Sequence, residues 1–343
     1  MKRFFVVFLA LSMAVGMVFL SGCSSASQGG AAATAQKPIT IKLPHIYGDG
    51  HPTTVAIETF FKKEIEARSN GALIVEPYPN STLATEEQIY EGLRNGTYEM
   101  GMMGIIIQDT LPTVAAFQLP FLFESFDDAK VALLDNGYGL QLLEGIEDQG
   151  IKAYTINPDG FRIMTLNRKV ESMADFRGFK LRTANYENMI KMGELLGCSV
   201  TPMAMTEVFS ALEQKVVDGQ ENPPATIRAA GWYEVQPYMM VSNHVFSPNF
   251  TCINLNFYNS LSDELKAVID EVCYEMTDVI WALAIESAKT DIEYMESNAD
   301  LEVYYPSDEF RQGMIESIAP LYETLYQNSP RAKEIVEAII ALR

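Results

Sequence analysis

An arginine in an apolar segment is the side chain of this sequence best suited to binding chemistry. Residues 178–184 read GFKLRTA, which places Arg182 among apolar neighbours where water would solvate it poorly. A guanidinium offers paired N–H donors that match the two oxygens of a carboxylate. Two roles therefore fit Arg182: it binds a carboxylate from outside the protein, or it forms a structural ion pair.

A second polar segment, DGQENPP at residues 218–224, ends in a rigid pair of prolines. Asn222 within this segment has an amide that can donate to an anion, or it can cap the turn that follows.

Motifs that carry catalysis or metal binding are missing from the sequence, including GxSxG, the P-loop, GxGxxG, HExxH and the EF-hand loop. Paired acids occur at expected helix starts, where they favour the helix dipole. These pairs are Glu86-Glu87, Asp127-Asp128 and Asp263-Glu264. The three histidines, His45, His51 and His244, are scattered. We therefore expect no enzymatic activity, no cofactor and no metal site.

The charge balance excludes another class of partner. The 343 residues include 45 acidic and 25 basic side chains, giving a formal net charge of −20. Nucleic acids and anionic membrane surfaces both require basic patches, so neither is an expected main partner. Hydrophobic residues make up 48% of the chain, which is enough for a globular core, and the length suggests about two domains.

The N-terminus predicts export and lipid anchoring. Lys2 and Arg3 precede an apolar run at residues 4–20, and Cys23 follows small residues. This pattern is typical of a lipoprotein signal peptide over residues 1–22, with Cys23 lipidated. The alternative is a transmembrane anchor, for which the run has about the minimum length. Residues 23–37 are mostly small and polar and predict a flexible tether.

Three further cysteines remain after Cys23. Three is an odd number, so not all of these cysteines can form disulfides within one chain; they are Cys198, Cys252 and Cys273. Either all three are free thiols, or one pair forms and one thiol stays free.

The elements that must position Arg182 and Asn222 alternate between strands and helices. This alternation predicts an α/β fold with a mainly parallel sheet. A helix is expected at residues 126–147 and a strand at 151–157. The turn residues 158–160 predict a break before a new strand at 161–167. Another strand is expected at residues 251–257.

Residues 262–297 predict one long helix, because an apolar stripe continues through them without glycine or proline. At 1.5 Å per residue this helix is about 54 Å long, more than the width of one small domain. A helix of this length should run across both domains.

The stretch from Phe176 to Tyr238 resembles the DctP-type substrate-binding proteins of tripartite ATP-independent periplasmic (TRAP) transporters. The matching segments are GFKLR at 178–182, GCSVTPM at 197–203, EVFSALEQ at 207–214, VDGQENP at 217–223 and WYEV at 232–235. Weaker similarity extends over the rest of the chain beyond the signal peptide and tether.

The resemblance implies a two-lobed periplasmic-binding-protein-like α/β fold in which the long helix spans both lobes and a cleft closes on a small organic acid. Approximate lobes follow: lobe I at residues 38–159 and 248–287, and lobe II at residues 160–247 and 288–343. Closure is expected to hinge near Pro158 and Pro248 and along the helix at residues 262–297.

The same resemblance assigns roles to single residues. Arg182 is similar to the main carboxylate-binding arginine of the family, and Asn222 to its accompanying asparagine. Arg162 matches a second arginine used by some members. Met205 stands where sialate-binding members carry an aromatic residue, and Met103 where they carry an acid. These two departures argue against sialic acid as the ligand and fit a smaller or more apolar acid.

The function expected from these observations is a lipid-anchored monomer outside the cytoplasmic membrane that delivers a carboxylate to a TRAP permease. A C4-dicarboxylate, a 2-oxo acid and a sugar acid remain open as ligands. Two alternatives from other classes are a secreted α/β enzyme acting on organic acids and the binding protein of an ATP-driven transporter.

Overall fold

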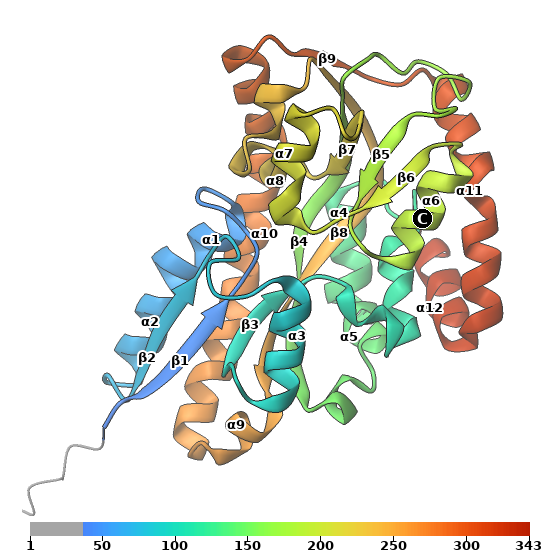
Figure 1. Cartoon of the computed structure of the whole chain (residues 1–343). Coiled ribbons are helices and arrows are strands. Elements are labelled where there is room, and N and C mark those ends of the chain that lie inside the picture. Colours follow the sequence, from blue (N-terminus) through green and yellow to red (C-terminus); the bar gives the residue numbers. More distant parts are fainter. Residues whose placement is uncertain (1–36) are drawn as a thin grey trace, which may run out of the picture. The chain divides into compact units, whose positions relative to one another are not determined.

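Two strands much longer than the others, β4 (Ile151–Leu166) and β8 (Tyr238–Asn254), form the centre of the fold and run antiparallel (Figure 1). The computed structural model describes residues 37–343. The signal peptide, Cys23 and all but the last residue of the expected tether lie outside the described residues. Within residues 37–343, no helix combines the length and the apolar character needed to cross a membrane.

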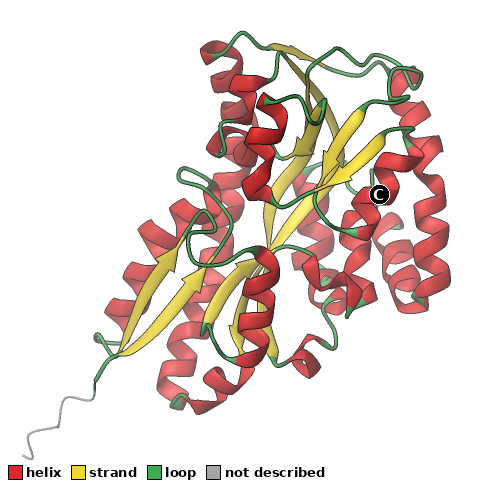
Figure 2. Cartoon of the chain, viewed as in Figure 1, coloured by secondary structure: helices red, strands yellow, loops and turns green. Residues whose placement is uncertain are grey.

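Shorter strands flank these two. They are β1 (Ile39–Pro44), β2 (Leu73–Tyr78), β3 (Met100–Met103), β5 (Lys180–Thr183), β6 (Ser199–Pro202), β7 (Gly219–Asn222) and β9 (Glu302–Tyr304). The α-helices are α1 (Pro52–Ala56), α2 (Lys62–Arg68), α3 (Glu86–Asn95), α4 (Phe126–Lys130), α5 (Tyr138–Leu142), α6 (Glu187–Leu195), α7 (Val208–Glu213), α8 (Pro224–Ala229), α9 (Leu255–Ser260), α10 (Asp263–Asn298), α11 (Asp308–Asn328) and α12 (Pro330–Ile340). Figure 2 shows helices outside the strands on both halves of the molecule.

The main sheet is mixed, with strand order β3-β8-β4-β7-β5-β6 and β9 beside β8. Its centre is antiparallel, because β4 and β8 run in opposite directions and β3 and β7 pair antiparallel with them. Parallel pairing is confined to β5 with β6 and β7, β8 with β9, and the separate β1–β2 pair. The prediction of a mainly parallel sheet is therefore wrong for the centre of the fold.

The expected break at residues 158–160 is also wrong, since β4 continues through it. Pro158 lies opposite Pro248 in β8, and the register shifts between Pro158 and Gly160. Gly160 has a φ of 126°, a value that a residue with a side chain rarely adopts. A turn-like sequence has thus formed a β-bulge within one strand instead of a loop between two.

Two other expected elements are shorter than the sequence predicts. The helix expected at residues 126–147 is interrupted by a π-type turn at Val131–Asp135 and by Gly137, whose φ is 70°. The strand expected at 251–257 ends at Asn254, where the side chain of Asn254 caps α9. A side-chain cap of this kind starts a helix in spite of the flanking β-favouring residues.

The long helix is confirmed as α10, and its N-cap is the Ser262 hydroxyl. Residues from Ile269 to Ile280 of α10 belong to a hydrophobic cluster with β1, β2, α1 and α2. Met295, near its other end, belongs to a separate cluster with α7, α8 and Trp232. Figure 1 shows α10 passing behind both groups. The fold is therefore two-lobed, with β4, β8 and α10 running from one lobe to the other.

Candidate functional site

A cleft lies beside the β4–β8 crossover, where the two lobes meet. Its walls come from both lobes and from the crossover itself. The polar and sulfur-containing residues that line it include Tyr47, Glu86, Asp159, Arg162, Arg182, Tyr186, Met203, Met205, Asn222 and Ser247. The structure thus brings together the two arginines, the asparagine and one of the two methionines that the sequence singled out.

Arg182 is 3% exposed and faces the cleft from β5. One of its terminal nitrogens, Nη2, donates to the Met203 carbonyl at 2.7 Å, and its Nε is buried without a hydrogen-bond partner. No acidic side chain of residues 37–343 forms an ion pair with it. Burial lowers the pKa of Arg182 to about 10, so it stays positively charged at neutral pH. A buried guanidinium with free donors favours an anionic partner from outside the fold.

Arg162 is equally buried but has a carboxylate partner within the protein. Its Nη2 donates to Glu221 Oε1 at 2.8 Å, its Nε donates to Glu221 Oε2, and its Nη1 donates to Ser247 at 3.2 Å. Burial alone would lower the pKa of Arg162, but Glu221 more than offsets it and the pKa is raised. The structural ion pair that was considered for Arg182 is therefore formed by Arg162.

Asn222 lies on β7 opposite Ile163 of β4, which places it next to Arg162 across the sheet. Its Nδ2 donates to Gln220 at 2.9 Å, and Gln220 in turn donates to Thr165 at 3.0 Å. These bonds orient the Asn222 amide along the cleft wall.

The two methionines occupy different environments. Met205 lines the cleft at the start of a 3₁₀ turn. Met103, expected at the same wall, is fully buried in a hydrophobic cluster and pairs with Phe250 on β8. The pleat of β3 directs this side chain into the core, so the cleft wall is formed at the next residue, Gly104.

Sequence reasoning missed a pair of cleft residues, Glu86 and Tyr186. The Tyr186 hydroxyl donates to Glu86 Oε2, and the Gly104 N–H donates to Glu86 Oε1 at 2.7 Å. Burial raises the pKa of Glu86 to about 7, although both hydrogen bonds lower it. Glu86 is also in the first turn of α3, so the helix-start role inferred from sequence is correct but incomplete. No local pattern distinguishes it from Glu87, which is exposed.

A second missed group surrounds Asp159 in the bulge of β4. His51 Nδ1 accepts from the Thr53 N–H at 3.2 Å, so its Nε2 carries the proton and donates to Asp159 at 2.9 Å. Thr226 donates to the same oxygen at 3.1 Å. The ring of Tyr47 stacks on His51 with a centroid distance of 4.3 Å. Residues from both lobes therefore meet at the bulge.

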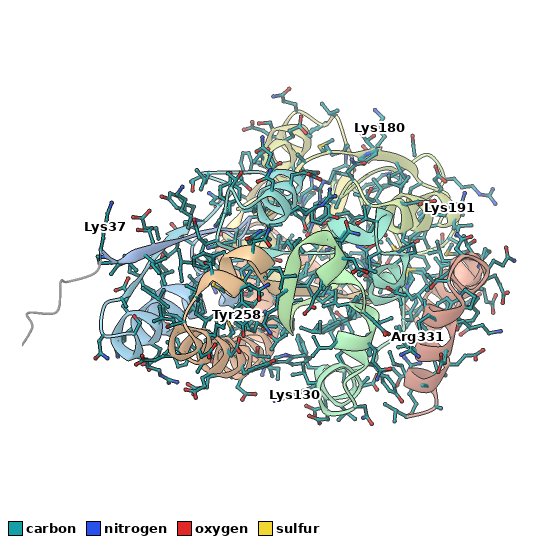
Figure 3. The ribbon with its side chains drawn as sticks, turned by 90° about the horizontal axis from the view of Figure 1, so that it is seen from below. Lys37, Lys130, Lys180, Lys191, Tyr258 and Arg331 are labelled. Atoms are coloured by element: carbon teal, nitrogen blue, oxygen red, sulfur yellow. The ribbon has the colours of Figure 1, made fainter. Side chains whose placement is uncertain are left out.

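Two lysines on the elements around the cleft, Lys180 and Lys191, are absent from its lining. Lys180 and Lys191 are exposed, and Figure 3 places both at the edge of the molecule. Within the described chain, no group of histidine, cysteine, aspartate and glutamate side chains suits a metal ion. Cys198, Cys252 and Cys273 are free thiols. The fold and the cleft therefore define a two-lobed solute-binding protein in which residues 37–343 supply one buried cation, Arg182, without an ion-pair partner.

Comparison with known proteins identifies the family. Residues 43–329 match DctP, the bacterial extracellular solute-binding protein family 7, and the chain belongs to this family. A 28% identical relative over 297 residues, 84% of this chain and 87% of its own length, is the C4-dicarboxylate-binding periplasmic protein DctP of Rhodobacter capsulatus.

Two solved structures are similar over almost their whole length. One is a TRAP periplasmic solute-binding protein from Haemophilus influenzae with bound L-gulonate, at 34% identity and a TM-score of 0.85, covering 89% of this chain and 99% of its own. The other is the sugar acid binding protein DctPAm from Advenella mimigardefordensis in complex with galactonate, at 29% identity and a TM-score of 0.85, covering 90% and 99%. The chain is thus a TRAP solute receptor for organic acids, as the sequence predicted.

Proposed function

We propose that this receptor binds a hydroxylated monocarboxylate, a sugar acid, with the ligand carboxylate on Arg182. The observation that carries the proposal is the charge balance of the cleft. Arg182 is the buried cation without an ion-pair partner within residues 37–343, because Arg162 is paired with Glu221. One free guanidinium matches one carboxylate.

The rest of the cleft favours hydroxyl groups over a second carboxylate. Glu86, Glu87 and Asp159 line it, and carboxyl oxygens accept hydrogen bonds from hydroxyls. This holds for Glu86 also when it is protonated, as it partly is near neutral pH because its pKa is raised to about 7. A second ligand carboxylate would instead meet like charge, which costs several kcal/mol. Asn222 and Arg162 assist by fixing the geometry around Arg182, and Met205 contributes an apolar wall. The sugar acids bound by the two similar structures support this choice among the three ligand classes.

A titration panel tests the ligand class. Isothermal calorimetry with L-gulonate, D-galactonate, D-glucuronate, succinate and pyruvate should show at least one sugar acid binding about 100-fold more tightly than succinate, a difference of about 2.7 kcal/mol. Succinate binding as tightly as every sugar acid would contradict the proposal. Pyruvate as the tightest ligand would replace it with a 2-oxo acid receptor.

The placement of the receptor is part of the same proposal. The body acts as a monomer, tethered outside the cytoplasmic membrane by a lipid on Cys23, and delivers its ligand to TRAP permease subunits. The lobes are those inferred from sequence, residues 38–159 with 248–287 and residues 160–247 with 288–343. Mass spectrometry of the mature N-terminus tests the anchor: a chain that starts elsewhere with an unmodified thiol would refute it.

A further inference from the structure

One side chain at the start of α6 reaches across the cleft to the other lobe. Tyr186, the N-cap of α6, donates its hydroxyl to Glu86 at the start of α3. Two residues further along, Asn188 Nδ2 donates to the carbonyl of Ala115 at 3.0 Å. Ala115 lies in the 3₁₀ segment Pro112–Gln118, which packs against α6, α11 and α12, so this second bond stays on the side of α6.

The helices on the two sides have separate supports. The helix α3 packs against β3 and β8, whereas α6 packs against β5, β6, α11 and the segment Pro112–Gln118. The bond between Tyr186 and Glu86 therefore holds together two helices that would separate if the lobes moved apart.

Gly104 has the residue type that this contact requires. A Cβ at Gly104 would lie 2.8 Å from Glu86 Oε1 and 3.4 Å from the Tyr186 hydroxyl. A methyl group there would displace the Glu86 carboxylate, which accepts hydrogen bonds from the Tyr186 hydroxyl and the Gly104 N–H. Glycine at this position leaves room for the Glu86 carboxylate to lie between the Gly104 N–H and Tyr186.

We propose that Tyr186 and Glu86 form an interlobe clasp that holds the cleft closed and limits the rate of ligand release. Tyr186 is a positioning residue in this clasp, because its hydroxyl also fixes the Glu86 carboxylate that faces the ligand. The clasp rests on the proposed function for its effect on ligand release, but its effect on the ligand-free receptor is independent of any ligand.

The position of Tyr186 in the cleft explains why its bond to Glu86 would slow the release of the ligand. The Tyr186 side chain is 8% exposed and lines the cleft, so a ligand leaving past it requires the bond to Glu86 to break. Interactions that form only after closure slow dissociation and leave the encounter step nearly unchanged. The clasp should therefore change the dissociation rate more than the association rate.

The test uses Tyr186→Phe, which removes one hydroxyl and keeps the ring. The matched control is Tyr305→Phe, because Tyr305 is 70% exposed and outside the cleft. Small-angle scattering on the ligand-free protein should give a larger radius of gyration for Tyr186→Phe than for wild type and Tyr305→Phe. Stopped-flow measurements with L-gulonate or D-galactonate as the probe should show release about tenfold faster, equivalent to about 1.4 kcal/mol.

Two further variants test the clasp independently. Gly104→Ala should shift the radius and the release rate in the same direction as Tyr186→Phe without removing any donor, whereas Asn188→Ala should leave both at the wild-type values. Wild-type scattering and release rates in both Tyr186→Phe and Gly104→Ala would overturn the clasp. If neither probe binds wild type, the ligand assignment fails, while the ligand-free scattering still decides whether the clasp exists.

Discussion

At the scale of single residues, the behaviour of the cleft depends on which guanidinium has a carboxylate partner inside the protein. Arg162 is paired with the Glu221 carboxylate, whereas within residues 37–343 the hydrogen-bond partner of Arg182 is the Met203 carbonyl. Removing Arg182 should therefore take away the ligand's ion pair and leave the fold without an orphaned acid. Hydrogen bonds to charged groups contribute about 1.5–3 kcal/mol each.

Arg182→Ala should accordingly weaken sugar-acid binding by about two to four orders of magnitude, at about 1.4 kcal/mol per tenfold. Arg182→Lys should recover only part of this loss, because lysine keeps the charge but cannot supply two parallel donors. Calorimetric titration measures the affinity for the sugar acid, and melting of the ligand-free protein measures the stability of the fold. Near-wild-type affinity in a folded Arg182→Ala protein would refute the assignment, as would a large loss of stability with unchanged affinity.

Glu86 predicts a pH dependence of stability. Burial raises its pKa from an ordinary value of 4.5 to about 7, so the folded protein holds this proton more tightly than the unfolded chain does. The resulting stability is fully present below about pH 4.5 and is lost as the pH rises through about 7. Between pH 5.5 and 8, the free energy of unfolding should fall by about 1–2 kcal/mol more in wild type than in Glu86→Gln.

A buried histidine changes stability in the opposite direction, which makes the variant comparison necessary. Burial lowers the pKa of His45 from 6.5 to about 3, so its contribution is lost as the pH falls below about 6.5. This effect is common to wild type and Glu86→Gln and cancels in their difference. Urea unfolding of both proteins at the two pH values measures the free energy of unfolding. If this free energy changed by the same amount with pH in both proteins, the role of Glu86 would be contradicted.

The residue scale also shows what the sequence could predict. Arg182 and Asn222 were identified because their segments are unusual and match a family. The Arg162–Glu221 pair joins residues far apart in sequence, and it exists only because β4 lies beside β7. Glu86 and Tyr186 meet across the cleft. Met103 lies in the core and not in the cleft wall, because the pleat of β3 directs its side chain there. None of these contacts has a local signal.

At the scale of elements, the local sequence predicted which helices and strands form better than it predicted where they are interrupted. The helix α10 was found because its apolar stripe is uninterrupted, and the bounds differ from those expected by one residue at each end. In contrast, Pro158 and Gly160 suggested a loop, although pairing with Pro248 holds them in one strand. Pairing with β8 keeps residues 158–160 within one strand, and the sequence around the bulge does not indicate this partner strand.

Trp281 gives an element-scale prediction, because it attaches α10 to the crossover strand. Its Nε1 donates to the Ile156 carbonyl of β4 at 3.0 Å, and its ring stacks with Phe246 of β8 at a centroid distance of 6.1 Å. Trp281→Ala should destabilise the fold by about 3–5 kcal/mol through the cavity and the lost bond. The matched control on the same helix is Ile285→Ala, at a 44% exposed position, which should change stability by about 0.5 kcal/mol or less. Equal melting temperatures for the two variants would contradict this role of Trp281.

At the scale of the whole molecule, a net charge of −20 opposes the approach of an anionic ligand. The attraction must therefore be local, and a buried cation in a closed cleft provides it because Coulomb interactions are stronger where water is excluded. Closure is therefore part of binding, because Arg182 attracts the ligand most strongly when both lobes surround it.

Closure of the two lobes involves the molecule as a whole. The lobes should approach when a sugar acid binds, with bending near Pro158 and Pro248, since β4 and β8 are the strands that cross between them. Small-angle scattering should show a smaller radius of gyration at saturating ligand than without it. Arg182→Ala is the control: at the same ligand concentration, its radius should stay at the ligand-free value, because the interaction that couples binding to closure is missing. An unchanged radius in saturated wild type would mean that the ligand enters a receptor that is already closed, and the clasp at Tyr186 would then have to open before each binding event.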